Sequence, residues 1–242
     1  MKVIAVIPAR LKSTRLKEKM LKLIAGKPLV WYTYNNTKRS KVSDVVIATD
    51  STKIKKTLED LGCKIILTSK KHKSGTDRIG EVSKKIYADY YINVQGDEPL
   101  IKPQILNQII DYIRKSKRVE ILTVAKKIKD KSEIENPAVV KIVTDKNKNA
   151  LYFSRAPIPY NREQKTNVNY YKHLGIYCYK YSVLQKIIKL KQSYLEKIEK
   201  LEQLRWLENG FDIKVIETKY DTISVDTEKD FKIVKKIIES SL

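Results

Sequence analysis

The sequence has few of the residues that form redox, thiol and metal sites. Its 242 residues include two cysteines and two histidines, without a Cys-X-X-Cys pair or a spacing that suits a metal. Cys63 and Cys178 lie far apart beside apolar residues, so we expect buried, reduced thiols rather than a disulfide. No Ser/His/Asp or Cys/His nucleophile arrangement can be recognised. This favours chemistry by positioning and metal charge over a covalent intermediate.

Several ligand-binding and membrane signals are also absent. Gly26-Lys27 lacks the G-x-x-x-x-G-K-[ST] spacing of a Walker A loop, and no G-x-G-x-x-G occurs, which argues against a dinucleotide redox enzyme. The N-terminal apolar run is short and ends in charge, unlike a signal peptide. No apolar stretch reaches the about 18 residues of a membrane span. The sequence therefore predicts a soluble protein of the reducing cytoplasm.

Acidic residues are scarce relative to basic ones. Asp and Glu number 28 against 50 Lys and Arg, which gives a formal net charge of +22. Such a charge is compatible with nucleic-acid or membrane binding. However, the lysines are spread through almost every segment, without a basic block. We favour a lysine-rich solvated surface with a site for a polyanionic substrate, and keep a basic nucleic-acid-binding protein as the alternative of another class.

Apolar runs and helical patterns alternate in the first half of the chain. Strands are expected at residues 2–7, 44–48, 64–68 and 90–94, and helices at 28–40, 51–61, 76–87 and 103–114. This order predicts an α/β protein with a Rossmann-like, mainly parallel central sheet and helices on both faces.

The second half predicts a smaller mixed α+β extension. Strands are expected at residues 119–124, 138–143, 150–153, 172–179 and 213–216, a hairpin turn at 145–149, and one amphipathic helix at 193–209 closed by Gly210. A last helix presents Phe231, Val234, Ile237 and Ile238 on one face. We therefore expect a single domain over 1–242, with a core at about 1–118, the extension at about 119–225 and a C-terminal helix at 226–242.

Cations and hydroxyls follow the first strand. The apolar run VIAVI ends before Arg10, Ser13, Arg15 and Lys19. Ligands bind at the carboxyl ends of strands in open α/β sheets. Fixed cations there suit a ligand with several negative charges, most simply a nucleoside triphosphate.

Two carboxylates, Asp97 and Asp226, each end a probable strand. Mg²⁺ often takes one or two carboxylates together with substrate phosphates, so the pair is a candidate metal site. Each aspartate has an ordinary alternative, because Asp97 could cap a helix in a turn and Asp226 could be a plain N-cap.

A loop between a strand and a helix, residues 72–78, could read the edge of a base. Its backbone amides and hydroxyls would contact the base, with Arg78 as a further donor, although simple helix capping explains the same residues. His173 lies on a probable strand, where a lone histidine is more often structural than catalytic.

Ten strings in chain order resemble the 3-deoxy-manno-octulosonate (Kdo) cytidylyltransferases, also called CMP-Kdo synthetases. They are IPARLKSTRL with Lys19, GKPL (26–29), ATD (48–50), HKSGTDR (72–78), NVQGDEPLI (93–101), NPAVVKIV (136–143), ALYFSRAPIPY (150–160), HLGIY (173–177), LEQLRWLENG (201–210) and VDT (225–227). Residues 17–20 depart from the pattern, since they read Lys-Glu-Lys-Met where the family commonly has Pro-Gly-Lys-Pro.

The resemblance implies a nucleotidyltransferase fold and a reaction. CTP and the acid sugar Kdo would give CMP-Kdo and pyrophosphate for lipopolysaccharide biosynthesis, by in-line attack of the anomeric hydroxyl on the α-phosphorus with Mg²⁺. It also implies a homodimer. The eight-amino analogue of Kdo and other acid sugars, such as a sialic acid, stay open as substrates, as does a catalytically inactive relative.

The resemblance also implies roles for individual residues. Lys19, Arg10 and Asp97 would be catalytic, and Asp97 and Asp226 would hold the metal. CTP would be bound by Arg10, Ser13, Arg15, Lys19, Ser74, Gly75, Thr76 and Arg78. The sugar would be bound by Gln95, Arg155, His173, Tyr177, Glu202 and Gln203.

Overall fold

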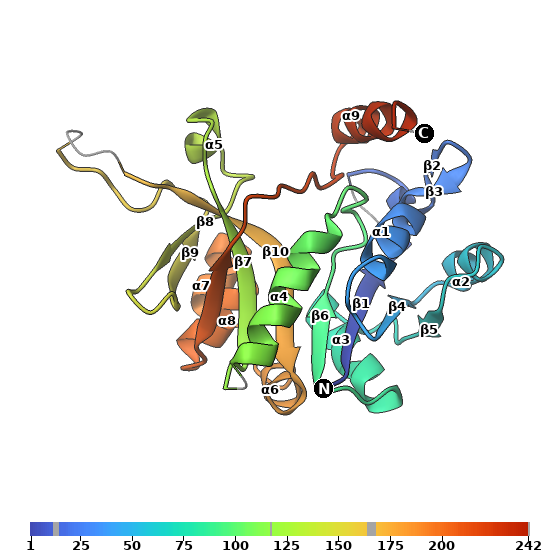
Figure 1. Cartoon of the computed structure of the whole chain (residues 1–242), viewed down its shortest axis with the longest axis horizontal. Helices are drawn as coiled ribbons and strands as arrows, with labels where there is room; N and C mark the ends of the chain where they lie inside the picture. Colours follow the sequence, from blue (N-terminus) through green and yellow to red (C-terminus); the bar gives the residue numbers. More distant parts are fainter. Residues whose placement is uncertain (12–14, 117, 164–167, 242) are drawn as a thin grey trace. The chain divides into compact units, whose positions relative to one another are not determined.

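The computed structural model describes residues 1–11, 15–116, 118–163 and 168–241 (Figure 1). The chain divides into two compact units, Met1–Lys115 with Asp221–Leu242, and Ser116–Tyr220. The C-terminal helix thus belongs to the same unit as the N-terminal half. No helix in these described ranges is long and apolar enough to cross a membrane.

The first unit contains the expected parallel sheet. Its strands, in the order β6-β1-β4-β5, are β6 (Tyr90–Asn93), β1 (Val3–Ala9), β4 (Asp44–Thr49) and β5 (Ile65–Leu67). All three pairings are parallel. The strand order reverses at β1, so right-handed crossovers place the helix before β6 on the face opposite the two earlier helices. The prediction of a mainly parallel sheet with helices on both faces is confirmed.

The helices of the first unit begin where the sequence offers capping residues. They are α1 (Leu29–Lys38), α2 (Thr52–Glu59), α3 (Gly75–Lys85), α4 (Pro103–Lys115) and α9 (Glu228–Glu239), with a 3₁₀ turn η1 (Lys19–Leu21) and a hairpin of β2 (Leu23–Ile24) and β3 (Lys27–Pro28). Ser51 Oγ accepts from Ile54 N and caps α2. Ser74 and Thr227 form capping boxes with the third helical residue of α3 and α9.

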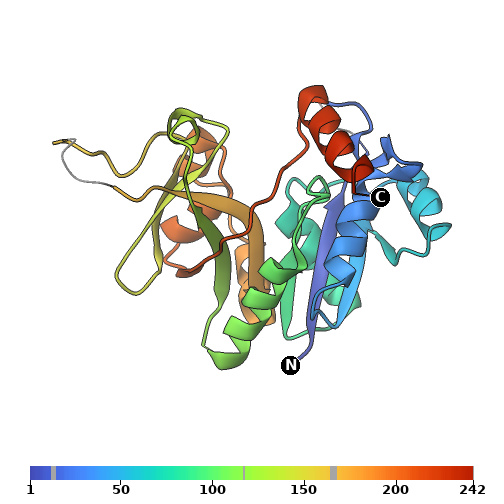
Figure 2. The same cartoon turned by 45° about the horizontal axis from the view of Figure 1, so that its top comes forward.

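Helix α9 lies beside the β2–β3 hairpin (Figure 2). It buries Phe231, Val234 and Ile238 in a cluster that includes Leu29. The expectation that Ile237 shares this face is wrong, because its side chain is 38% exposed. Three apolar positions per three turns are enough to seat this helix.

The second unit is the expected mixed extension. Strand β7 (Ile121–Lys127) pairs antiparallel with β10 (Tyr171–Lys180) and parallel with β11 (Ile213–Glu217). A hairpin of β8 (Lys141–Thr144) and β9 (Ala150–Ser154) joins β10. Its turn is closed by Asp145 N donating to Asn149 O at 2.8 Å, as predicted. Two short helices that the sequence reading missed are α5 (Ser132–Glu135) and α6 (Tyr181–Ile187).

The prediction of a single helix over residues 193–209 is wrong. The structure has two helices, α7 (Tyr194–Glu199) and α8 (Gln203–Glu208), separated by Lys200 in a left-handed conformation with φ 55°. The Glu199 carbonyl accepts from Arg155 Nε at 2.8 Å, and its carboxylate accepts from Ser154 Oγ at 2.6 Å. Because that carbonyl bonds to another segment, it is not available to continue the helix.

Candidate functional site

Lys19 joins the two predicted metal ligands in the first unit. Its Nζ lies 2.6 Å from Asp97 Oδ2 and 3.0 Å from Asp226 Oδ1. The lysine side chain is 8% exposed, whereas the two carboxylates keep 20% and 38% of their surface. Arg15 Nη2 lies 3.0 Å from the same oxygen of Asp226. Residues 78 and 207 positions from Lys19 thus converge on one ammonium group.

The local fold leaves both carboxylates available for this contact. Thr227, not Asp226, caps α9, so the alternative interpretation of Asp226 as a plain N-cap is not observed. Asp97 lies in a turn closed by Glu98 N donating to Gln95 O at 3.2 Å, and the next helix, α4, begins only at Pro103. A backbone hydrogen bond of 2.9 Å from Val225 N to Asp97 O ties the two segments together.

Gly96 is required by packing beside this site. A Cβ at this position would lie 2.9 Å from Pro8 O, closer than real Cβ atoms approach, and 3.1 Å from Met20 Sδ, which is a tight contact. Its carbonyl accepts from Thr33 Oγ1 at 3.0 Å. The glycine therefore lets the end of β1 and η1 pack against the Asp97 segment.

The two carboxylates fit a divalent cation of the magnesium type. An oxygen of each lies within 3.0 Å of one atom, Lys19 Nζ, so a single ion can reach both with small side-chain movements. No cluster of three or more His, Cys, Asp or Glu residues that could hold a metal occurs among the described residues. A metal at Asp97 and Asp226 would take its remaining ligands from phosphates and water, as Mg²⁺ commonly does.

Glu18 adopts a backbone conformation that favours glycine. Its φ is 50° and ψ 33°, at the position where the resembling family commonly has glycine. Non-glycine residues pay about 1 kcal/mol for this left-handed region. An ion pair of 2.6 Å between Glu18 Oε2 and Lys53 Nζ on α2 accompanies it. The chain therefore forms the turn before Lys19 with glutamate in place of glycine at position 18.

Glu98 is a buried acidic residue for which the sequence analysis predicted no role. Its side chain lies next to the Asp97 segment, and Oε2 has no hydrogen-bond partner in the described part of the chain. Burial, and then the charge of Asp97, raises the pKa of Glu98 to about 8. Glu98 is therefore mostly neutral at pH 7, and the negative charge beside Lys19 resides on Asp97 and Asp226.

The predicted base-reading loop lies at the same end of the sheet. Ser74 Oγ accepts from Asp77 N at 3.1 Å, and Thr76 is buried in the first turn of α3. A Cβ on Gly75 would lie 3.3 Å from Pro8 Cγ, so this turn packs on the loop that follows β1. The capping alternative is thus observed for Ser74, and contact with a base stays a prediction.

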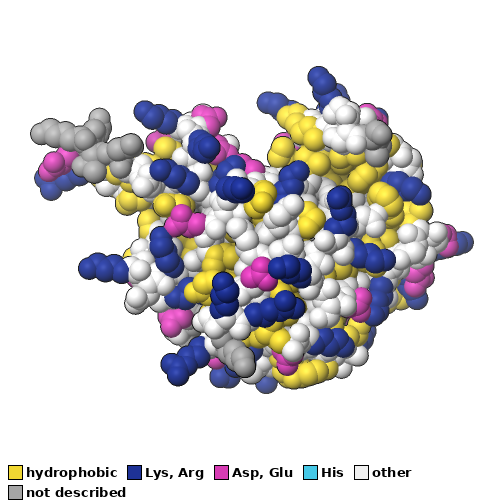
Figure 3. Space-filling view, in the orientation of Figure 1, with side chains coloured by type: hydrophobic (Ala, Val, Ile, Leu, Met, Phe, Trp, Pro, Cys, Tyr) yellow, Lys and Arg dark blue, Asp and Glu magenta, His cyan; other side chains and the backbone are white. Residues whose placement is uncertain are grey.

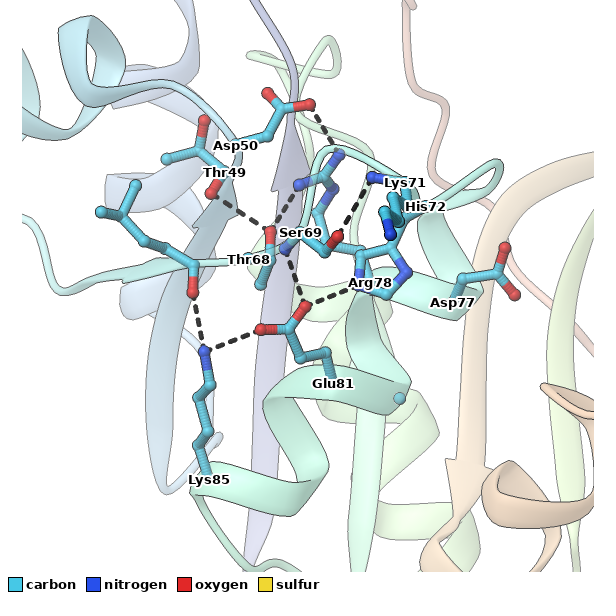
Figure 4. Close-up of polar contacts among 12 residues, drawn as sticks. Thr49, Asp50, Thr68, Ser69, Lys71, His72, Asp77, Arg78, Glu81 and Lys85 are labelled. Atoms are coloured by element: carbon cyan, nitrogen blue, oxygen red, sulfur yellow. Dashed lines mark hydrogen bonds and ion pairs between the residues drawn. The ribbon is translucent and has the colours of Figure 1, made fainter.

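Arg78 braces the strand ends rather than projecting freely. It is 4% exposed, donates to Thr68 Oγ1, and pairs with Asp50 Oδ2 at 3.1 Å (Figure 4). Thr68 Oγ1 in turn donates to Thr49 O at 3.1 Å. Arg78 therefore joins the carboxyl ends of β4 and β5 to α3, and its predicted contact with CTP remains untested.

Glu81 holds the preceding part of this loop. Figure 4 shows its carboxylate between the loop and Lys85. It accepts from Ser69 N at 2.8 Å and Lys85 Nζ at 2.8 Å, and lies 2.6 Å from His72 Nε2. Burial alone would raise the pKa of Glu81, but these three hydrogen bonds lower it to about 2.

We expect Glu81→Gln to destabilise the protein by about 1–2 kcal/mol at pH 7, because a charged acceptor is lost. A carboxyl group with a depressed folded-state pKa contributes stability above its unfolded pKa, and loses it as pH falls through the folded pKa. The difference between variant and wild type should therefore shrink from about pH 5 towards pH 2. Urea unfolding at several pH values measures it, and a constant difference would contradict the assignment.

Arg155 is the predicted carboxylate-binding residue of the second unit. Its Nε donates to Glu199 O at 2.8 Å and its Nη1 to Pro137 O at 2.8 Å. Nη2 has no partner among the residues that the structure describes. Lys141, which is fully buried, donates to the Arg155 carbonyl at 2.6 Å. The guanidinium is thus held by two backbone carbonyls, through Nε and Nη1.

Three of the other predicted sugar residues belong to an aromatic and polar cluster in this unit. Tyr177 packs against His173, with centroids 5.1 Å apart, and edge-on against Trp206 at 5.0 Å. Gln203 Nε2 and Trp206 Nε1 are buried in this cluster without a hydrogen-bond partner among the described residues. Burial raises the pKa of Tyr177 well above its usual range, so its hydroxyl stays protonated. Unpaired buried donors are costly and suit a hydroxyl-rich ligand.

Glu202, the fifth predicted sugar residue of this unit, is oriented by Arg205. Arg205 Nη2 lies 2.9 Å from Glu196 Oε1 and 3.4 Å from Glu202 Oε1, and Nη1 donates to Leu190 O at 3.0 Å. The sequence did not single out Arg205 or Trp206, because both read as ordinary positions of an amphipathic helix.

The remaining predicted residues belong neither to the Lys19 contacts nor to the aromatic cluster. Arg10 directly follows β1 and is exposed, and Ser13 lies outside the described residues. Gln95 belongs to the first unit, where its Nε2 donates to Asn93 Oδ1 at 3.2 Å. The structure thus brings Arg15, Lys19, Asp97 and Asp226 together, and groups the other sugar residues within the second unit.

The large positive charge does not gather into one patch on the face shown in Figure 3. Lysine and arginine side chains are scattered there among uncharged and acidic ones. Several are paired, such as Lys41 with Asp111 at 2.9 Å and Lys172 with Glu133 at 2.6 Å. This distribution agrees with a solvated basic surface.

Comparison with known proteins identifies the family. A family model described as Cytidylyltransferase matches residues 4–217. The chain is 47% identical to the 3-deoxy-manno-octulosonate cytidylyltransferase of Koribacter versatilis, over 99% of this chain and 91% of the relative. It is also 47% identical to that of Chloroherpeton thalassium, over the full length of both. A solved structure of a CMP:2-keto-3-deoxy-manno-octonic acid synthetase complexed with CTP matches with TM-score 0.95 and 38% identity over all of both chains. The chain therefore belongs to the family of 3-deoxy-manno-octulosonate cytidylyltransferases.

Proposed function

We propose that this protein transfers the cytidylyl group of CTP to Kdo and releases pyrophosphate. The sugar oxygen forms a bond to the α-phosphorus, the bond from that phosphorus to pyrophosphate breaks, and the hydroxyl proton is lost to solvent. The observation that carries the proposal is the convergence of Lys19, Asp97 and Asp226 within the parallel-sheet unit. The family names and the CTP-bound relative support the choice of substrates.

Cations of the first unit would bind the triphosphate. Arg10 and Arg15 are exposed, and Lys19 is held in place by two carboxylates. Two anions must approach each other in this reaction, and fixed cations offset their repulsion while stabilising charge on the departing pyrophosphate. Lys19 is the best positioned of the three because its ammonium is already oriented and largely shielded from water.

Asp97 and Asp226 would hold Mg²⁺. When bound, Mg²⁺ would neutralise charge on the α-phosphate and favour ionisation of the attacking hydroxyl. The two carboxylates would position the ion, and Lys19 would lie beside it to contact the phosphates. The Val225–Asp97 backbone bond keeps the two ligand-bearing segments in register.

Residues of the second unit would bind the acid sugar. The Arg155 guanidinium suits the sugar carboxylate, since a hydrogen bond between two charged groups is stronger than one between neutral groups. The unpaired Gln203 Nε2 would bind a hydroxyl, together with Tyr177, Glu202 and His173.

Pyrophosphate release with CTP, Mg²⁺ and a panel of acid sugars tests the proposal. We expect turnover with Kdo, and the panel should include its eight-amino analogue and a sialic acid to rank the alternatives. Omission of the sugar should stop release. If no acid sugar supports release by the folded protein, the proposed function is wrong.

Arg155→Ala should weaken sugar binding selectively. We expect the KM for Kdo to rise about 10- to 100-fold, because a charged hydrogen-bonded pair is worth about 1.5–3 kcal/mol. The KM for CTP should change little. Steady-state kinetics with each substrate varied in turn measures both values. A larger effect on CTP than on Kdo would remove Arg155 from the sugar site.

We also propose that the protein acts as a homodimer in the cytoplasm, in lipopolysaccharide biosynthesis. The free, buried Cys63 and Cys178 support a reducing compartment. Sedimentation velocity tests the dimer, and a monomer at assay concentrations would contradict it.

A further inference from the structure

Thr123 and His173 are joined across neighbouring strands of the second unit. Thr123 Oγ1 on β7 lies 2.9 Å from His173 Nε2 on β10. The same hydroxyl donates to the carbonyl oxygen of Ile176 at 2.8 Å. Ile176 lies in an irregular stretch of β10, where the register against β7 shifts between Leu174 and Tyr177. Both contacts are to β10, and a hydrogen bond from Thr123 also acts on the Tyr177 side chain.

The direction of these two hydrogen bonds fixes the protonation of the imidazole. A threonine hydroxyl has one proton, and a carbonyl oxygen can only accept. The 2.8 Å contact with the Ile176 oxygen is a hydrogen bond only if Thr123 donates its proton there. Thr123 can then only accept from His173, so Nε2 carries a proton. In a neutral ring with Nε2 protonated, Nδ1 has a free lone pair.

The surroundings keep the His173 ring neutral and in place. Burial lowers its pKa to about 3, well below neutral pH. The Phe153 ring packs edge-on against the imidazole, with ring centroids 5.0 Å apart. The Tyr177 ring is tilted against it, with centroids 5.1 Å apart. The residue as a whole is partly exposed.

We propose that Thr123 is a positioning residue that locks His173 with its proton on Nε2, so that Nδ1 accepts a hydrogen bond from a hydroxyl of the acid sugar. The identity of the ligand rests on the proposed function, whereas the tautomer does not. His173 then offers no positive charge to the sugar carboxylate, which is left to Arg155. By fixing the tautomer, Thr123 determines that His173 accepts a hydrogen bond from the sugar and does not donate one through Nδ1.

The tautomer can be observed directly because the chain has only two histidines. Protein labelled with ¹⁵N-histidine gives two imidazole spin systems in a long-range ¹H–¹⁵N spectrum, and His72→Gln identifies that of His173. We expect a protonated Nε2 and an unprotonated Nδ1 at pH 7. Addition of Kdo should shift the Nδ1 resonance and leave the proton on Nε2. A proton on Nδ1 in the free protein, or an imidazolium in the complex, would overturn the proposal.

Substitutions at position 123 separate positioning from simple packing. Thr123→Val keeps the shape but removes the hydroxyl, so the two ring-nitrogen shifts should move towards each other as both tautomers become populated. The KM for Kdo should rise about tenfold, as expected for one weakened hydrogen bond, with the KM for CTP unchanged. Thr123→Ser keeps the hydroxyl and should restore both the spectrum and the KM.

The outcomes distinguish this inference from the proposed function. If Thr123→Val leaves the imidazole spectrum unchanged, Thr123 does not fix the tautomer. If no acid sugar is turned over, the proposed function fails, while the spectrum of the free protein still decides the role of Thr123. If Thr123→Ser behaves like Thr123→Val, the effect is one of packing, and the proposal is overturned.

Discussion

Asp97→Asn should reduce CTP-dependent pyrophosphate release by at least about 100-fold, while the fold is retained. The substitution preserves shape but removes one of the two charges that would position Mg²⁺, and interactions with developing charge are commonly worth this much. The backbone bond from Val225 N to Asp97 O does not depend on the side chain, so the segment should stay in place. Steady-state rates with thermal unfolding measure both effects.

The matched control is Asp111→Asn. Asp111 forms an exposed ion pair with Lys41 at 2.9 Å, in the same unit as Asp97. Exposed pairs contribute about 0–1 kcal/mol, so activity and stability should stay near wild type. If Asp97→Asn retains a near-normal rate, the metal assignment is wrong.

Lys19→Met should lower kcat/KM for CTP by about 100-fold, since a charged contact to the triphosphate is lost. The ammonium also offsets part of the negative charge of Asp97 and Asp226 in the absence of substrate. The variant should therefore be less stable without metal, and Mg²⁺ should raise its melting temperature more than that of wild type. Binding to the folded state alone stabilises it by mass action.

Lys41→Met is the corresponding control, because it removes the other half of the exposed pair. It should leave both kcat/KM and the response to Mg²⁺ unchanged. An unchanged kcat/KM in Lys19→Met would remove Lys19 from the site. An equal Mg²⁺ response in Lys19→Met and wild type would show that the ammonium and the ion do not share the two carboxylates.

The sequence predicted those parts of the fold that local pattern determines. The apolar run of β1 is buried almost throughout, and Ser51 begins a helix where its side chain can cap one. Asp97 could be recognised because it follows β6, and the carboxyl ends of parallel strands meet at one edge of a sheet. The prediction that Asp226 ends a strand is wrong, because β11 ends at Glu217 and Asp226 lies in the segment just before α9. Its convergence on Lys19 therefore does not follow from that rule.

What the sequence could not show depends on contacts between distant segments. The break at Lys200 arises because Arg155, 44 positions before Glu199, takes the Glu199 carbonyl. The Thr123–His173 pair joins residues 50 apart on neighbouring strands. The raised pKa of Glu98 comes first from burial by the surrounding fold, which no local pattern encodes. Secondary-structure propensity depends on the residues of one segment, whereas these features depend on the segments that pack against it.

The most direct test of the account is the identity of the products. Purified protein is incubated with CTP, Kdo and Mg²⁺, and the phosphorus-containing products are quantified by ³¹P NMR. We predict one phosphodiester resonance of a CMP-sugar for each pyrophosphate formed, and no reaction when the sugar is omitted. Formation of CDP and inorganic phosphate, or of free CMP without a sugar product, would contradict the proposed transfer.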